Sequence, residues 1–386
     1  MEFTAGGRLE VRITPSDVGK RVSVRRTGDE GPGSEKFTDT VGVLTSWDRG
    51  VLVITRRTGE TVRIPESSLV AGKVVPAAPA RRRGPAAAFA ELAPVLARAW
   101  QPVESEPLGE WTLRAARGFT RRANSVLPLG DPGMPLDAAL ARVRDWYGER
   151  GLPPYVQVAT GAEGTQEPLC AALEERGWRR QVTVEVRIGA LAAVADVPEA
   201  PGAPGTAGTP ETPGTARTPG VPGTPGTPGT PGMPGAPGVV LSRTLDEAWL
   251  RRYQRVGVPG PHVRAVLSAG PSVWFASVAG EGEVPAAIGR CVVDGRWAGF
   301  MAVEVDPAYR RQGLATAVMA ALAARALEEG ASAAWLQVES DNDGARALYD
   351  GMGFGVHHHY HHFRAPEAAD GPSGSADASG RSRTGT

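Results

Sequence analysis

The apolar positions of the chain fall into runs with two different spacings. Before residue 76, β-branched residues recur at every second position in four short runs, which begin at Arg21, Thr40, Val51 and Thr61. Gly and Asp interrupt these runs, as in Asp48 to Gly50. Short strands joined by tight turns predict a small all-β unit over residues 1–76.

The size and turn pattern of this unit lead us to expect a small SH3-like barrel. It shows no pattern of acid and base residues, so we interpret it as a packing module or a docking site for a protein partner. Its excess of Arg and Lys is mild. A nucleic-acid tether is therefore a third, less favoured hypothesis, and nucleic acid is not expected as a partner.

Residues 86–190 carry helical and strand spacing in alternation. Ala86 to Trp100 predicts a helix, in which Pro94 marks a boundary or a kink. Further helices are expected at Leu136 to Arg150 and at Glu167 to Arg176. Strand-like runs begin at Trp111, Ser125, Tyr155 and Gln181. This order predicts an α/β unit.

Residues 239–364 repeat that order. Strands are expected from Val239, Ser272, Ala286, Ala334 and Phe354, with a hairpin turning at Asp294 and Gly295. The main helices are expected at Leu314 to Glu329 and Asn342 to Gly351. We interpret the two α/β units as a tandem pair with mixed sheets flanked by helices. In the first copy, Arg117 to Ser125 corresponds to the loop before the long helix and lacks a glycine at the helix entry.

Composition adds two disordered segments to this picture. Of the 386 residues, 50 are Gly and 34 are Pro, too many for compact structure throughout. A Pro/Gly/Thr tract over 195–238 is expected to be a disordered linker, and 365–386 a disordered tail. The net charge of zero provides no global field for nucleic acid or anionic membrane.

Two cysteines without partner spacing suit a reducing compartment. The first residues lack a basic segment followed by an apolar core, so we expect no signal peptide. No apolar run is long enough to span a membrane, so we expect no membrane partner. Together these features predict a cytoplasmic protein.

The stretch from Val303 to Val318 carries the strongest chemical signal. A strand leads into Arg310 and Arg311, then Gly313, then an apolar helix. The start of a helix presents unpaired N–H groups with positive partial charge, and a glycine lets the backbone approach a ligand. These features predict a cradle for a pyrophosphate. The loop fits neither the Walker A nor the dinucleotide pattern.

The surroundings of this loop resemble the GCN5-related N-acetyltransferase (GNAT) family. That family shows Arg/Gln-x-x-Gly-x-Gly/Ala after a strand, and about 35 residues later an Asn, an Ala, a Leu-Tyr pair and a Gly-Phe pair. Here these stand at Asn342, Ala345, Leu348 with Tyr349, and Gly353 with Phe354. The resemblance covers about residues 239–364. It implies the α/β GNAT fold and acetyl-CoA as co-substrate, with no metal.

The resemblance also implies roles for single residues. The strand edge at Val303 and Val305 would pair with the pantetheine arm. Asn342 would hydrogen-bond the pantetheine or the loop, and Tyr349 would protonate the departing thiolate. The pyrophosphate would be held by Arg310, Arg311, Gln312, Gly313, Leu314, Ala315 and Thr316. For Tyr349, a core aromatic of an amphipathic helix is the alternative.

Direct attack by an amine requires that the amine be neutral, so a base is expected. Glu304, on the strand leading to the loop, is our candidate, with a surface carboxylate or the partner of an arginine as the alternative. The acceptor is an amine of a small molecule or a protein. The layout resembles a group of actinobacterial acetyltransferases labelled histone-acetyltransferase-like or acetylglutamate-synthase-like, and nothing in the residues selects lysine or glutamate.

Two alternatives complete the sequence interpretation. The run from His357 to His362 places His357, His359 and His361 on one face of a regular strand, which could hold a metal. We favour a substrate-facing or interface strand instead. The whole protein could also be an acyl-CoA-binding regulatory or interaction protein without catalysis. Asn342 and Tyr349 favour the enzyme.

Overall fold

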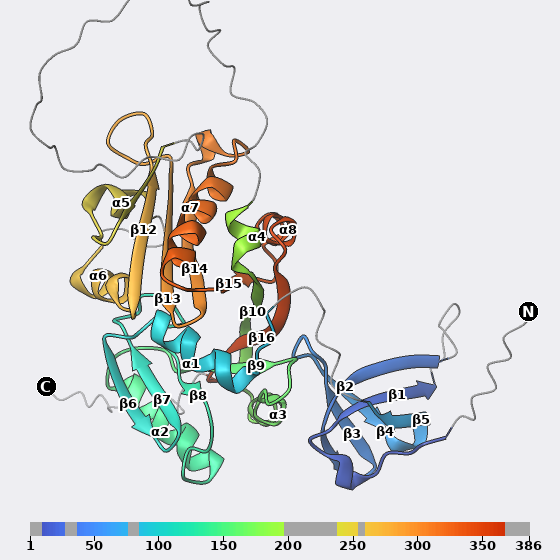
Figure 1. Ribbon diagram of the computed structural model, residues 1–386. Coiled ribbons are helices and arrows are strands. Elements are labelled where there is room, and N and C mark those ends of the chain that lie inside the picture. Colours follow the sequence, from blue (N-terminus) through green and yellow to red (C-terminus); the bar gives the residue numbers. More distant parts are fainter. Residues whose placement is uncertain (1–9, 28–36, 76–84, 197–237, 254–258, 367–386) are drawn as a thin grey trace, which may run out of the picture.

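The computed structural model describes residues 10–27, 37–75, 85–196, 238–253 and 259–366 (Figure 1). The segments predicted to be disordered, 195–238 and 365–386, lie almost entirely outside these residues. The described residues form three β-sheets and eight α-helices. None of these helices combines the length and the apolar character that crossing a membrane requires.

The N-terminal residues form a five-stranded antiparallel sheet in the order β4-β3-β2-β1-β5. Its strands are β1 (Arg21–Thr27), β2 (Phe37–Asp48), β3 (Val51–Thr55), β4 (Thr61–Pro65) and β5 (Leu69–Val74). Burial alternates along β1, where Val22 and Val24 enter a small core with Leu44 and Ile54. The all-β prediction is confirmed. The described strands do not close into a barrel, because β4 and β5 are the two edges, so the SH3-like assignment stays a prediction.

The next segment begins with α1 (Phe89–Ala99), which continues through Pro94 rather than ending there. A three-stranded sheet follows, made of β6 (Glu104–Leu108), β7 (Trp111–Ala115) and β8 (Leu127–Pro128). Two helices cover it and the neighbouring strand, α2 (Leu136–Gly148) and α3 (Glu167–Glu175). The apolar stripe predicted for α2 is buried, including Leu140, Val143 and Trp146. The helices predicted here are therefore present.

An eight-stranded mixed sheet forms the centre of the molecule, in the order β11-β12-β13-β14-β15-β10-β16-β9. Its strands are β9 (Tyr155–Thr160), β10 (Arg179–Ala190), β11 (Val239–Ser242), β12 (Ser272–Val278), β13 (Ala287–Asp294), β14 (Trp297–Val305), β15 (Ala333–Glu339) and β16 (Gly355–Arg364). Only β14 and β15 run parallel. The predicted mixed sheet is confirmed.

The two α/β segments share this sheet through an exchange of strands. β10, from the first segment, lies between β15 and β16 of the second. In return, β16 lies between β10 and β9 of the first segment. Each segment therefore completes the sheet of the other. The two copies predicted from the sequence form a single interleaved body in the structure.

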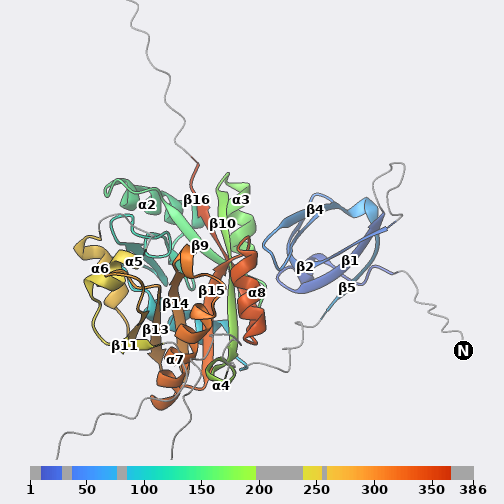
Figure 2. The same cartoon turned by 90° about the horizontal axis from the view of Figure 1, so that it is seen from above.

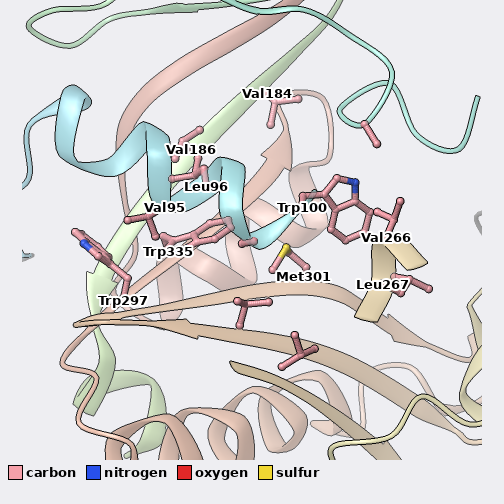
Figure 3. Packing of buried hydrophobic residues seen from close by; sticks show 14 of the residues in the cluster. Val95, Leu96, Trp100, Val184, Val186, Val266, Leu267, Trp297, Met301 and Trp335 are labelled. Carbon is pink, nitrogen blue, oxygen red and sulfur yellow. The ribbon is translucent and has the colours of Figure 1, made fainter. Parts of the chain in front are cut away.

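Helices cover both faces of the central sheet. On one face lie α7 (Leu314–Glu328), α4 (Leu191–Ala195) and α8 (Asp343–Gly351), with Val318 and Leu322 at the centre of their core. On the other lie α1, α5 (Glu247–Arg252) and α6 (Pro261–Ser268). Figure 2 shows α4, α7 and α8 gathered on one side of the sheet. Figure 3 shows α1 crossing the opposite face, where Leu96 lies over Trp335 and Val186.

The N-terminal sheet contacts this body through the turn between β3 and β4. The carbonyl of Arg57 accepts a hydrogen bond of 3.0 Å from Thr160 Oγ1 on the edge strand β9. Arg180 donates to the carbonyls of Thr58 and Gly59. A Cβ atom on Gly59 would lie 2.3 Å from His361 Nε2, so only glycine allows this approach. The turn is thus fitted closely to the central body.

Candidate functional site

The strands β14 and β15 are paired for only part of their length. Pairing runs from Trp297 with Ala333 to Phe300 with Leu336 and ends there. Beyond that point β15 continues beside β10, whereas β14 continues beside β13. The sheet is therefore open between the two parallel strands, next to Val303 and Val305.

A β-bulge marks the place where β14 turns away. Its register with β13 shifts between Ile288 and Arg290, which leaves one extra residue in β14. Ala302 has a φ of 52°, an uncommon left-handed backbone for a residue with a side chain. One edge of the segment from Val303 to Val305 pairs with β13, so its other edge faces the opening. A ligand with amide groups could pair there as an added strand.

The loop from Asp306 to Gly313 joins this strand to α7. Asp306 Oδ1 accepts a hydrogen bond of 2.8 Å from the amide of Ala308, and Arg252 donates to Oδ2 of the same carboxylate. The amide hydrogen bond and, after it, Arg252 hold the pKa of Asp306 below its ordinary value. Asp306 therefore has a fixed partner on each side, which anchors the start of the loop.

The end of the loop exposes a row of backbone amides. Arg311 has a φ of 63° and Gly313 a φ of 77°, so both are left-handed. The first helical hydrogen bond runs from Ala317 N to Gly313 O at 2.9 Å. Among the described residues, the amides from Arg311 to Thr316 have no backbone acceptor. This is the arrangement that binds phosphate oxygens at helix starts.

Positive charge surrounds these amides. The side chains of Arg310 and Arg311 are exposed, as is that of Gln312, while Leu314 is buried and anchors the helix to the core. Ala315 and Thr316 are half-buried in the first turn of α7. The described residues thus place the predicted phosphate-binding groups in one loop at the mouth of the open sheet.

Asn342 has a role in the helix that the sequence interpretation missed. It is the N-cap of α8, and its Oδ1 accepts a hydrogen bond of 3.1 Å from the amide of Ala345. An Asn just before a helical run is a common N-cap signal, so the sequence contained it. The side chain is exposed, which leaves its amide group accessible to a ligand.

Tyr349 lies on α8 and packs into the core that also holds the strand edge. Its half-buried ring is 6.1 Å from that of Phe354, in an edge-to-face arrangement. The same core includes Val303, Val305 and the buried Leu314. The structure therefore gathers the tyrosine, the strand edge and the helix start on the α7 face of the sheet.

Glu304 belongs to the opposite face. Side chains alternate along a strand, and its neighbours Val303 and Val305 both pack on the α7 side. Glu304 pairs across the sheet with Ile288, which packs on the face of α1, α5 and α6. The two predicted catalytic side chains are thus on different faces, with the open part of the sheet between them.

The first segment holds α8 in place through buried charges. Glu185 on β10 pairs with Arg346 at 3.2 Å and with Arg187 at 2.9 Å. Arg187 also pairs with Asp350 at 2.9 Å. The side chains of Glu185 and Arg187 are only 6% and 4% exposed. Sequence reasoning did not identify this network, although two charged residues alternating with Val184 and Val186 in a strand were a possible signal.

The histidines of β16 do not form the arrangement expected from strict alternation. The register with β10 shifts at His357, so this residue is bulged out and its Nε2 lies 3.0 Å from the carbonyl of Ala87. His361 lies instead between Thr160 and Thr183, with both hydroxyls 2.9 Å from its ring nitrogens. The prediction that His357, His359 and His361 share one face is therefore wrong.

Burial keeps these histidines neutral. It lowers the pKa of His359 to about 4 and that of His361 to about 3, with Arg57 and Arg180, respectively, as the next causes. In the part of the chain that the structure describes, no group of three or more His, Cys, Asp or Glu is placed to hold a metal ion. The described contacts give the histidines a packing role between strands.

The loop of the first segment that corresponds to the glycine loop is not the one expected from sequence. Val126, just before β8, and Val156 on β9 form an isolated parallel bridge, and α2 lies between them in the sequence. The loop leading into α2 is Leu129 to Pro135, whereas Arg117 to Ser125 joins β7 to β8. The loop from Leu129 to Pro135 has glycines but contains Asp131 and no basic residue. Its charge is therefore unsuited to phosphate.

The chain is similar to acetyltransferases in part of its length. A 141-residue segment is 35% identical to the probable histone acetyltransferase Rv0428c of Mycobacterium tuberculosis, over 36% of this chain and 44% of that protein. A 52-residue segment is 40% identical to the [ribosomal protein bS18]-alanine N-acetyltransferase of Escherichia coli, over 14% of this chain and 35% of that protein. The chain thus matches less than half the length of either relative.

Among solved structures, a GCN5-related N-acetyltransferase from Kribbella flavida matches with 17% identity and a TM-score of 0.49, over 73% of this chain and 98% of that one. A family model described as "Probable histone acetyltransferase Rv0428c C-terminal" matches residues 88–198 and 229–363. These two ranges are the two interleaved α/β segments, and they make up more than half of the chain. The protein therefore belongs to the probable histone acetyltransferase Rv0428c C-terminal family.

Proposed function

We propose that the protein is an N-acetyltransferase that transfers the acetyl group of acetyl-CoA to a primary amine by direct attack. One observation carries this proposal. The amides from Arg311 to Thr316 have no backbone acceptor among the described residues, and they lie next to the one open pair of parallel strands. A ligand with a diphosphate and an amide-bearing arm fits both features at once. The names of the relatives support the same chemistry.

Each part of the site has a binding task in this proposal. The amides of the loop, with Arg310 and Arg311, hold the diphosphate. The edge of Val303 to Val305 that faces away from β13 pairs with the pantetheine amides, which directs the thioester along the opening between β14 and β15. Asn342 offers its amide group to the same arm. These contacts orient the acyl donor and need no covalent bond to the protein.

Two side chains are the proposed proton donor and proton acceptor of the reaction. The acyl donor supplies an activated acetyl group with a thiolate leaving group, which a nearby phenol can protonate. Tyr349, on the α7 face, is the proposed donor of that proton. Glu304, on the opposite face, is the proposed base for the attacking amine, directly or through water. The separation of the two groups by the sheet allows donor and acceptor to enter from opposite faces.

We extend the proposal to the acceptor substrate, the cellular location and the N-terminal sheet. The acceptor is an amine of a small molecule or a protein, the protein is cytoplasmic, and the N-terminal sheet is a candidate docking site for a protein partner. An acyl-CoA-binding regulatory protein without catalysis is the alternative. Such a protein would bind acyl-CoA through the same loop and strand edge, so only a measurement of turnover distinguishes it from the enzyme.

Release of free CoA thiol in the presence of a panel of small amines and basic peptides tests the proposal. We expect amine-dependent release, and a Tyr349→Phe variant that is slower by about 100-fold, because a positioned general acid contributes at least that much. Tyr155→Phe, on the edge strand β9 outside the site, serves as the control and should be unaffected. Binding of acetyl-CoA without amine-dependent thiol release, and an unchanged Tyr349→Phe variant, would support the non-catalytic alternative.

A further inference from the structure

A cavity lined by polar and apolar side chains lies between the two α/β segments, and no residue of the glycine loop lines it. Its volume is about 30 Å³, enough for two or three waters or a carboxylate group. Helix α1 forms one wall, and strands β9, β15 and β16 contribute to the others. The polar side chains that line it are Arg114, Arg122, Gln157, Gln166, Gln337, His358 and Tyr360. Neither the family name nor the proposed chemistry assigns it a role.

The cavity has two positive charges and no acidic residue in its described lining. Arg114 is only 4% exposed, and its partners are neutral oxygens: the carbonyl and hydroxyl of Ser125, both at 2.9 Å, and Gln157 Oε1 at 2.8 Å. Within the described residues, no carboxylate lies in ion-pair contact with Arg114 or Arg122. Burying a guanidinium without an anion is unfavourable, so the cavity favours a negatively charged occupant.

Both arginines retain hydrogen-bonding capacity. A guanidinium has five N–H donors. Arg114 uses three hydrogen bonds, and Arg122 uses two, both at 3.3 Å to the Tyr360 hydroxyl. That hydroxyl in turn donates to Gln337 Oε1 at 3.1 Å. Arg122 is also held over the ring of Trp100, 5.3 Å from its centroid. The donors are thus held in position by neutral groups before any anion arrives.

The cavity adjoins a larger groove of about 740 Å³ in the first segment. Four residues line both spaces: Phe89, Ala93, Leu129 and Gln166. The groove runs along the loop from Leu129 to Pro135, and its described lining is mainly apolar, with Asp131 as its single ionisable residue. A phosphate-bearing ligand would meet no cation there. A small molecule with an apolar body and one negative end fits the two spaces together.

We propose that the first α/β segment is a binding site for a small aliphatic carboxylate. The carboxylate group lies between Arg114 and Arg122, which can each donate more than one hydrogen bond to it. The aliphatic end points past Phe89 and Leu129 into the groove. The site shares no residue with the glycine loop, and its occupancy is measured without acetyl-CoA.

Titration calorimetry of the full chain without acetyl-CoA tests this site. The probes are butyrate and its neutral isostere butyramide, which share shape and differ in charge. We expect saturable binding of butyrate and at least about 10-fold weaker binding of butyramide, because charge-assisted hydrogen bonds are the stronger ones. Arg122→Gln should weaken butyrate binding by at least about 10-fold. Arg121→Gln, an exposed neighbour outside the cavity, should leave it unchanged.

Three outcomes would overturn the proposal. They are equal affinity for butyrate and butyramide, equal loss in the Arg121→Gln and Arg122→Gln variants, and no saturable binding of any member of a series from acetate to hexanoate. If Arg122→Gln does not fold, the comparison of butyrate with butyramide on the unaltered chain decides alone. Acetyl-CoA turnover is measured separately, so failure here leaves the proposed transferase activity untouched.

Discussion

Two residues with left-handed backbones, Arg311 and Gly313, shape the loop of the candidate site. The glycine permits the turn that leads into α7, and the amides at this turn have no backbone acceptor among the described residues. The sequence predicted this loop, because a basic glycine turn between a strand and a helix is a local pattern. The cap made by Asn342 is a local signal that the sequence interpretation missed, whereas the bulge at Ala302 depends on how β14 pairs with β13 and could not be predicted.

Asn342 has a structural role in the structure and a ligand role in the proposal, and two substitutions separate them. Asn342→Ala removes the cap of α8 and should reduce the free energy of unfolding by about 1 kcal/mol as well as weaken acetyl-CoA binding. Asn342→Ser keeps a capping oxygen and should retain stability, but its shorter side chain should still weaken binding. Denaturant unfolding and calorimetric binding measure the two effects. Full affinity in Asn342→Ser would show that Asn342 acts only as a cap.

At the scale of elements, helix α8 depends on a strand from the other segment. Glu185 and Arg187 of β10 hold Arg346 and Asp350, which flank the turn that carries Tyr349. The pattern of apolar positions located α8 and β10 separately. It could not show that they touch, because they are more than 150 residues apart in the sequence. Contacts of this kind follow from the order of strands and not from local spacing.

Glu185→Gln tests whether this network positions α8, which carries the proposed proton donor Tyr349. Removing one partner of a buried ion pair should reduce the free energy of unfolding by about 3 kcal/mol, because Arg187 loses its buried counter-charge. If Tyr349 donates the proton, the turnover number should fall while the affinity for acetyl-CoA stays the same. The exposed pair of Arg264 with Glu247 gives the control, and Arg264→Gln should change stability by less than about 1 kcal/mol. Equal effects of the two variants would contradict a positioning role.

The elements also show where local patterns were insufficient. β5 was missed because Leu69 to Val74 contains a glycine, Gly72, that packs under Ile13 and breaks the alternation. The loop equivalent to the glycine loop was placed at Arg117 to Ser125, but the structure has it at Leu129 to Pro135. The two-residue strand β8 is too short to give a pattern, so the position of that loop could not be found from sequence.

At the scale of the whole molecule, two segments form one body by exchanging β10 and β16. The sequence predicted that the two segments repeat one order of strands and helices, and the structure has such elements in both segments. It did not predict that the copies interleave, because the same elements would also satisfy two separate sheets. The family match, interrupted between residues 198 and 229, follows this body.

The contact between the N-terminal sheet and the central body depends on a glycine, Gly59, at the turn between β3 and β4. Gly59 and Gly50 are both left-handed, with φ of 78° and 74°, so Ala strains both turns alike. Only at Gly59 would the added Cβ meet His361, while Gly50 has open space around it. Gly59→Ala should therefore release the sheet and increase the radius of gyration in small-angle scattering, and Gly50→Ala should not. An equal radius in the two variants would contradict the docked arrangement.

We expect the second α/β copy to bind acetyl-CoA and the first copy not to bind it, and a substitution in each copy distinguishes the two. Asp tolerates a left-handed backbone and would add a negative charge at Gly313 in the second copy or at Gly133 in the first, where φ is 77° and 74°. Calorimetry should give one acetyl-CoA per chain, a loss of affinity of about 100-fold in Gly313→Asp, and no loss in Gly133→Asp. Two acetyl-CoA molecules per chain, or a loss in Gly133→Asp equal to that in Gly313→Asp, would contradict the account.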